Sequence, residues 1–419
     1  MAKNNFKLTT LVTVGLLSTM TMQAQASEKE LLDVLLENGV ISKGQHKALE
    51  KKYTKKAAAK VKTKGGVKVK SEDGDFAFQF GGRVMVDAGY VDEDVASHDS
   101  GTEFRRLRMF AKGTLYKDWG YKVQVDYSDD ALAIKDAYIK YKPYGVTIGN
   151  FKQPISLEEL TSSKYITFME RSLPTVFATS HRIGLGINKG GSNWSAAASI
   201  YGGNSGDDED GQEGYGIGAR FTFAPIAQKT KAVHLGVAFA QEEPLDDGDD
   251  VRFRQRPEFH ATGTRIVDTG TISNVDDITK VGLEAAAVFG PFSLQAEHLS
   301  VDVSRDSGFD DYDFDGSYVS ASFFLTGESR PYSAKKGKFG RVKPKSKSTG
   351  AWELGLRYST LDLDDGALQG GEADNVTVGV NWYVNPHVRI MANYIDVDAE
   401  RAGVNDDPSI FAVRTQIDF

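Results

Sequence analysis

FAFQFGGRVMVDAGY, residues 76–90, is the stretch that decides which fold this chain can adopt. Arg83 and Asp87 stand at odd-numbered positions, whereas six apolar residues stand at even-numbered positions: Phe76, Phe78, Phe80, Val84, Val86 and Tyr90. Successive side chains of a β-strand point to opposite faces. Alternation over this length therefore predicts a strand with one apolar and one polar face.

The same alternation recurs along the rest of the chain. Sixteen strands are predicted, at residues 75–90, 104–115, 121–128, 134–142, 146–152, 183–189, 194–202, 214–224, 232–241, 279–289, 292–303, 316–326, 350–361, 374–384, 387–396 and 409–419. Connections after odd-numbered strands are mostly long and acidic, and those after even-numbered strands are mostly tight turns. This arrangement is typical of outer-membrane barrels. The expected fold class is all-β, a transmembrane antiparallel β-barrel of about 16 strands.

One connection departs from that scheme. SRPYSAKKGKFGRVKPKSKSTG, residues 329–350, is long and strongly basic, yet it falls on the side of the short turns. The strand pattern offers no explanation for it.

The two ends of the chain indicate export. Residues 1–26 carry lysines, then a short apolar run and a small-x-small site, which predicts a cleaved signal peptide. Residues 27–73 are expected to form a periplasmic helical segment and a basic linker (51–70), and residues 74–419 the barrel. The last strand, IFAVRTQIDF, ends in a terminal Phe, as in bacterial outer-membrane proteins. We therefore expect a Gram-negative outer-membrane protein that contacts lipid and lipopolysaccharide.

Composition gives little support to other classes of function. The chain has 419 residues, a net charge of −8, seven His and no Cys. The histidines are scattered and no G-x-S-x-G motif occurs, so an enzyme is not expected. Without clustered His or Cys, no metal site or cofactor is expected either. No nucleic-acid partner is predicted.

Strand parity selects the side chains that should face the lumen. If the apolar set faces lipid, the inward set includes Arg83, Arg106, Arg108, Lys112, Lys122, Lys140, Arg220, Arg357, Arg389 and Arg414. Basic positions in this set outnumber acidic ones although the protein is net negative. Rings of Arg or Lys favour passage of phosphate-like anions. The alternative is that individual arginines only pair with inward acids such as Asp126 or Glu353, as charges of both signs do in ordinary porins.

The stretch FKQPISLEELTSSKYITFMERSLPTVF, residues 151–177, does not read as a strand. Ser156 followed by Glu159 is a capping-box pattern that starts a helix. The segment follows the fifth strand on the long-loop side, and its apolar residues need a place to be buried. We expect it to fold into the lumen as a constriction loop; the alternative is a loop over the rim or on a neighbouring subunit. Inward folding would bring four cations near the pathway: Lys152, Lys164, Arg171 and Arg182.

Several motifs in order resemble the phosphate-selective porin O and P family: EFRRLRMFAKGTLYKDWGYKVQVDY, IGNFKQPISLEELTSSKYITFMERS, FFLTGESRPY and GAWELGLRYSTLDL. The likeness covers about residues 75–419. It implies a homotrimeric sixteen-stranded barrel with an arginine ladder and a lysine-bearing constriction that selects phosphate or polyphosphate. Arg106 and Arg108, in the RRLR motif, match the ladder best. A general diffusion porin with little anion selectivity, or a structural or adhesive barrel, are the alternatives.

Overall fold

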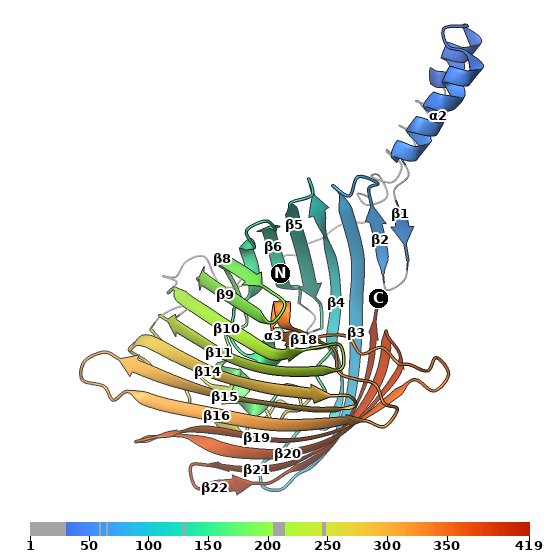
Figure 1. Ribbon diagram of the computed structural model, residues 1–419. Helices are drawn as coiled ribbons and strands as arrows, with labels where there is room; N and C mark the ends of the chain where they lie inside the picture. The colour runs from blue at the N-terminus through green and yellow to red at the C-terminus, as the bar shows by residue number, and fades with distance from the viewer. Residues whose placement is uncertain (1–30, 58–59, 64–65, 129–130, 204–213, 245–248) are drawn as a thin grey trace, which may run out of the picture.

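The computed structural model describes residues 31–57, 60–63, 66–128, 131–203, 214–244 and 249–419. The predicted signal peptide, residues 1–26, lies outside this part of the chain. Helical residues 31–37 and helix α2 (Lys43–Ala57) extend away from a large barrel of strands (Figure 1). No helix among the described residues is long and apolar enough to cross a membrane.

Sixteen strands in the described residues form the closed antiparallel barrel, which confirms the predicted fold (Figure 1). They are β3 (Ala77–Asp92), β4 (Gly101–Leu115), β5 (Trp119–Asp126), β6 (Ala133–Tyr141), β7 (Val146–Lys152), β8 (His181–Gly190), β9 (Trp194–Tyr201), β10 (Gly216–Ala227), β11 (Lys231–Glu242), β14 (Val275–Phe289), β15 (Phe292–Arg305), β16 (Tyr312–Phe324), β19 (Ala351–Asp365), β20 (Leu368–Asn385), β21 (Val388–Arg401) and β23 (Ser409–Asp418). Each pairs with the next, and β23 pairs with β3 to close the wall.

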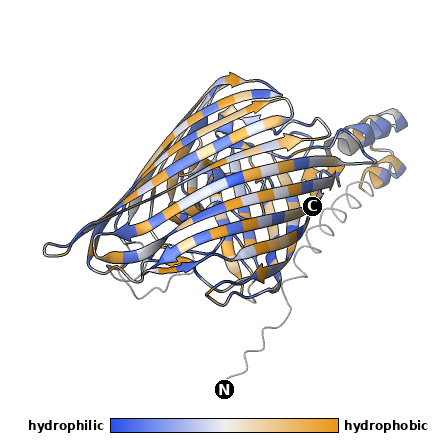
Figure 2. Ribbon diagram, turned by 90° about the horizontal axis from the view of Figure 1, so that it is seen from below, coloured by the Kyte–Doolittle hydropathy of each residue, from blue (hydrophilic) through white to orange (hydrophobic). Residues whose placement is uncertain are grey.

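Apolar and polar residues alternate along the barrel strands, as Figure 2 shows. In β19, the side chains of Leu354, Leu356 and Tyr358 are exposed on the outer face, while Glu353 and Arg357 are buried on the inner face. The predicted parity is therefore correct for this strand. An outward apolar band and an inward polar face are what a membrane barrel requires.

Two predicted loops are wrong because their strands continue. Residues 362–374 were expected to be a long acidic loop, but β19 and β20 stay paired, with Asp362 opposite Glu372 and Asp365 opposite Leu368. Likewise β21 continues to Arg401 and carries the short strand β22 (Val404–Asp406). The apolar pattern stops where the outer face leaves lipid. Hydrogen-bond pairing does not need apolar side chains, so the hairpins continue into water.

The linker expected at residues 51–70 is also wrong in its described part. Helix α2 reaches Ala57, and strands β1 (Lys60–Lys62) and β2 (Val67–Lys70) form a hairpin that pairs with β3. Phe419 exchanges main-chain hydrogen bonds of 3.0 and 3.1 Å with Gly82, and the edge of β3 before Gly82 is not paired with β23. Strand β2 satisfies that edge, as unpaired strand edges require.

Three connections fold into the lumen: residues 153–180, the described residues 249–274 of the long connection after β11, and residues 325–350. They contain the short elements α3 (Leu157–Leu160), η1 (Leu173–Phe177), β12 (Arg254–Gln255), β13 (Val267–Asp268), β17 (Tyr332–Ser333), η2 (Ala334–Lys336) and β18 (Lys338–Phe339). Figure 1 shows α3 and β18 inside the barrel. Apolar side chains of the first two connections, such as Phe177 and Phe253, pack with inward residues such as Val301 into one core. The predicted inward folding of the 151–177 stretch is therefore confirmed.

Candidate functional site

The constriction loop, residues 153–180, begins with one short helical turn. The hydroxyl of Ser156 accepts the main-chain N–H of Glu159 at 3.1 Å, as the capping pattern predicts. The main-chain N–H groups of Leu157 and Glu158 donate to the buried carboxylate of Glu297 on β15, both at 2.7 Å. The helix α3 nevertheless ends at Leu160, so the half-helical character expected for the whole stretch is limited to its start.

The second half of this loop is held through its main chain. Four wall side chains donate to four carbonyl oxygens: Arg389 to Ile166 at 2.8 Å, Asn381 to Thr167 at 2.8 Å, Arg414 to Met169, and Arg357 to Glu170 at 3.0 Å. The three arginines in this set are each 1% exposed. They lie behind the loop, so the structure brings them to the loop's backbone.

Phe168 lies between these anchors. Its ring is 2% exposed and faces Gly355 and Gly379, which are direct cross-strand partners in β19 and β20. A Cβ atom added at either glycine would meet the ring, at 3.0 and 3.3 Å. The guanidinium of Arg357 lies over this ring, 4.5 Å from its centroid. The pair of glycines thus makes a seat for this one side chain.

Arg105 is a lumen residue that strict alternation misses. In the pairing of β3 with β4, Met85 faces Arg106 but Val86 faces Phe104, so Arg105 is the extra residue of a β-bulge. The bulge turns two successive arginines inward. Arg105 forms a bidentate pair with Glu170 of the constriction loop, at 2.8 and 2.9 Å. The sequence contained a signal for this bulge: the outward apolar residues at positions 104 and 107 are three positions apart, whereas regular alternation would put them an even number apart.

A cavity of about 950 Å³ lies between the constriction loop and strands β5 to β10. Eight of the predicted cations line it: Arg83, Arg106, Arg108, Lys122, Lys140, Lys152, Arg171 and Arg220. Six lining cations were not predicted: Lys135, Lys142, Lys189, Lys335, Lys336 and Lys338. Against these fourteen, the acidic residues in the described lining are Asp136 and Glu159. We call this space the basic cavity.

The last three of those lysines come from the long basic connection. Its turn at η2 and β18 reaches up beside β9 and β10, where the main-chain oxygen of Gly337 accepts a hydrogen bond of 2.8 Å from Arg220. The order of strands placed this connection on the short-turn side, with no role assigned to it. A basic segment too long for a turn was the signal that it enters the lumen.

Several of the predicted cations are paired with acids, as the alternative reading expected. Arg108 pairs with Asp126 at 2.5 Å and Lys122 with Asp136 at 2.6 Å. Arg220 forms a bidentate pair with Glu284, at 2.7 and 2.6 Å. Arg414 pairs with both Asp87 and Glu170, and Arg357 with Glu258. The positive excess of the basic cavity remains after these pairs are subtracted, because Arg108, Lys122 and Arg220 are three of the fourteen cations in its described lining.

The other predicted cations lie elsewhere. Lys164 pairs with Asp418 at 3.2 Å and lines a separate cavity of about 420 Å³ with Lys112. Arg182 donates to the main-chain oxygen of His181 at 3.2 Å. Of the four cations expected at the constriction, Lys152 and Arg171 therefore reach the basic cavity.

Further arginines gather on residues 249–274, part of the stretch 242–278 that was expected to be a long acidic connection. Burial and the neighbouring charge of Arg105 lower the pKa of Arg256. Burial and the charges of Arg256 and Arg254 lower the pKa of Arg265. These arginines therefore lie close enough to one another for their charges to interact.

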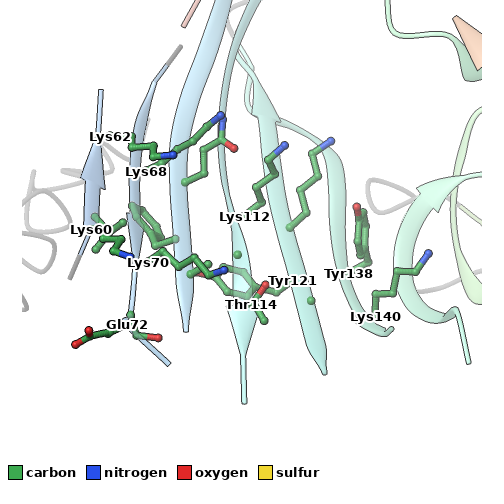
Figure 3. A pocket seen from close by; sticks show the side chains of 18 residues that line it. Lys60, Lys62, Lys68, Lys70, Glu72, Lys112, Thr114, Tyr121, Tyr138 and Lys140 are labelled. Carbon is green, nitrogen blue, oxygen red and sulfur yellow. The ribbon is translucent and has the colours of Figure 1, made fainter. Parts of the chain in front are cut away.

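Another group of lysines surrounds a cavity of about 650 Å³ beside the N-terminal hairpin (Figure 3). Lys60, Lys62, Lys68 and Lys70 come from β1 and β2, and face Lys112 and Lys140 of the barrel wall. Because the hairpin pairs with β3, the lysines of the supposed linker become part of the channel's mouth.

Comparison with known proteins gives consistent results. A model of the family described as phosphate-selective porin O and P matches residues 78–419. Porin O of Pseudomonas aeruginosa is 30% identical over 403 residues, covering 86% of this chain and 92% of the relative. An uncharacterized protein of Caulobacter vibrioides is 32% identical over 351 residues, covering 78% and 70%.

Solved structures share the fold at low identity. The anion-selective porin from Comamonas acidovorans has a TM-score of 0.54 at 13% identity, covering 82% of this chain and 100% of its own. The outer-membrane channel DcaP of Acinetobacter baumannii has a TM-score of 0.55 at 14% identity, covering 84% and 99%.

Proposed function

Because the chain belongs to the phosphate-selective porin O and P family and is an outer-membrane porin, we propose that it passes small anions, with phosphate or polyphosphate preferred. The observation that carries this proposal is the charge of the basic cavity, which fourteen cations line against Asp136 and Glu159. A narrow lumen of one sign concentrates ions of the opposite sign and lowers their energy there.

In this proposal the lumen cations have two different roles. Arg83, Arg106, Lys140 and Lys152, which line the basic cavity, contact the passing anion. Arginine offers paired donors that fit phosphate oxygens, and lysine acts as a point charge. Arg357, Arg389 and Arg414 instead hold the constriction loop in place through its carbonyl oxygens, so they act on the anion only indirectly.

Clusters of cations at the two mouths of the channel support the same preference for anions. On the side of the long loops, Arg254, Arg256 and Arg265 would draw anions toward the constriction despite the acidic loops around them. On the side of the short turns, the lysines of the N-terminal hairpin would draw them out. A path with several weak sites favours passage over trapping.

We further propose that the porin is a homotrimer. Strand β7 has 7 residues and β5 has 8, whereas β20 has 18. A membrane-spanning β-strand needs about 9–11 residues. This short side of the wall is suited to packing against another copy, where protein replaces lipid. An OmpT structure of Vibrio cholerae is described as a trimer form. Heat-resistant trimers on denaturing gels would support this; monomers at all concentrations would contradict it.

The function is tested by the zero-current potential of the protein in planar bilayers under a KCl gradient. We expect anion preference, and block of the chloride current by added phosphate. Cation preference would refute the proposal. Anion preference without phosphate block would indicate a general diffusion porin. This is the second candidate function, and it is favoured by the many ion pairs inside the lumen, because paired cations attract anions less strongly.

The residue assignment has its own test. Arg106→Ala combined with Arg108→Ala should reduce anion preference while trimers persist. Unchanged preference would refute the role of this pair in the pathway.

A further inference from the structure

Glu159 is an acid in surroundings that are otherwise basic. It belongs to α3 of the constriction loop, is 5% exposed and lines the basic cavity. Asp136, the other acid in the described lining, pairs with Lys122 of the adjacent strand. Glu159 differs because it comes from the loop that narrows the channel.

The carboxylate of Glu159 occupies a site built for an oxyanion. Arg171 Nε lies 3.0 Å from Oε2, Lys152 Nζ pairs with Oε1, and the Ser180 hydroxyl donates to Oε1 at 2.9 Å. A guanidinium, an ammonium and a hydroxyl around two oxygens are the donors that bind phosphate or sulfate groups. Burial alone would raise the pKa of Glu159, but Arg171 and Lys152 outweigh it and hold this pKa at about 2. The site is therefore filled by a charged group of the protein itself.

The donors of this site are fixed independently of the carboxylate. Arg171 also donates to the main-chain oxygens of Glu158 and Thr161, both at 3.1 Å, and of Glu159 at 3.2 Å. Lys152 donates to the main-chain oxygen of Glu159 at 2.6 Å. These bonds close the last turn of α3 and do not involve the acidic side chain. Neutralising the carboxylate would leave both cations in place, facing the cavity.

We propose that Glu159 is the channel's resident counter-anion and determines how tightly a passing divalent oxyanion, such as phosphate, is held at the constriction. The inference rests on the anion pathway proposed above. Conduction needs sites that attract an ion yet release it. A passing phosphate meets Lys152 and Arg171 already half neutralised, so it interacts without being trapped. Glu159 thus sets the specificity of the channel by limiting its affinity for phosphate at the constriction.

The test is Glu159→Gln, measured as phosphate block of the chloride current in planar bilayers. The half-blocking phosphate concentration should fall about a hundredfold, the effect on a divalent anion of removing one unit charge about 6 Å away at an effective dielectric constant of about 40. Each blocking event should lengthen accordingly. Glu372→Gln is the matched control, because it removes the same charge from an exposed position of β20. It should leave the block unchanged.

A second substitution separates charge from loop distortion. Arg171→Gln should weaken the block far more in the Glu159→Gln background than in the wild-type background, where Glu159 already neutralises Arg171. If Glu159→Gln does not assemble, Glu159→Asp draws the carboxylate away from the cations and should tighten the block by a smaller factor.

Two outcomes would overturn the inference. A half-blocking concentration within twofold of wild type in Glu159→Gln, or in Glu159→Asp where only that variant assembles, would show that Glu159 does not limit affinity. A weakened block would show that the carboxylate mainly supports the loop. Failure of the anion pathway is distinguishable, because it appears in the wild type as cation preference.

Discussion

Replacing Phe168 by alanine should loosen the constriction loop without harming the barrel. Phe168 is 2% exposed and fills the seat made by Gly355 and Gly379, with Arg357 stacked over it at 4.5 Å. Truncating a buried Phe to Ala typically costs about 3–5 kcal/mol. The strand pairing around the seat does not involve this side chain, so the loss falls on the loop's attachment.

A loss of about 3 kcal/mol changes the equilibrium between the attached and the detached loop about a hundredfold, since about 1.4 kcal/mol corresponds to a factor of ten. Four carbonyl anchors remain, so the attached state should still dominate. Single-channel recordings should show frequent excursions to larger conductance in Phe168→Ala. Phe168→Leu, which keeps most of the buried volume, should show few. Heat-resistant oligomers should persist in both variants.

The opposite perturbation tests the same seat. Gly355→Ala would place a Cβ atom 3.0 Å from the Phe168 ring and 3.1 Å from Thr167, so the loop must shift into the cavity. The single-channel conductance of Gly355→Ala should therefore fall below that of wild type. Equal conductance and equal current noise in wild type, Phe168→Ala and Gly355→Ala would refute the reasoning that this seat positions the constriction.

Three further predictions use other parts of the channel. Arg105→Ala should lower anion preference and phosphate affinity several-fold because Glu170 loses its bidentate partner, whereas Arg105→Lys should retain most of the preference; the zero-current potential distinguishes them. Gly337→Ala should displace the basic connection, because an added Cβ would lie 2.9 Å from Arg220 and 2.8 Å from Thr222; unchanged conductance would contradict the placement of Lys336 and Lys338 in the lumen. Gly66→Val should detach the N-terminal hairpin, because an added Cβ would lie 2.5 Å from the main-chain oxygen of Phe80; protease sensitivity of residues 60–63 should rise while the trimers stay intact.

The number of strands and their facing could be predicted because both depend on a period of two. Lipid on one side and water on the other impose that period on every strand, and it placed residues such as Arg83 and Arg220 correctly. The extent of the outer hairpins could not be predicted. Beyond the lipid, the outward face of β19 turns acidic at Asp362, so the signal disappears while the pairing continues.

The separate roles of the arginines in the candidate site could not be predicted, for a different reason. Arg357 and Arg106 both alternate inward, and only the course of the 153–180 loop decides which one meets the loop's carbonyl oxygens and which one meets the basic cavity. That course depends on contacts between residues far apart in the chain, such as Phe168 with Gly355. Arg105 was missed because a bulge interrupts the period, and Lys336 because it stands outside any strand.

The meeting of β23 and β2 on the edge of β3 has a practical consequence for experiments on this porin. Phe419 is hydrogen-bonded to Gly82, and a Cβ atom on Gly66 of the hairpin would lie only 3.1 Å from the carbonyl carbon of Phe419. An affinity tag fused to the C-terminus would have to leave through the space that the hairpin fills. Such a fusion would displace four lysines from the channel mouth and alter the very currents being measured. Tags belong in an outer hairpin such as the turn at Gly366, where an added side chain would meet open space.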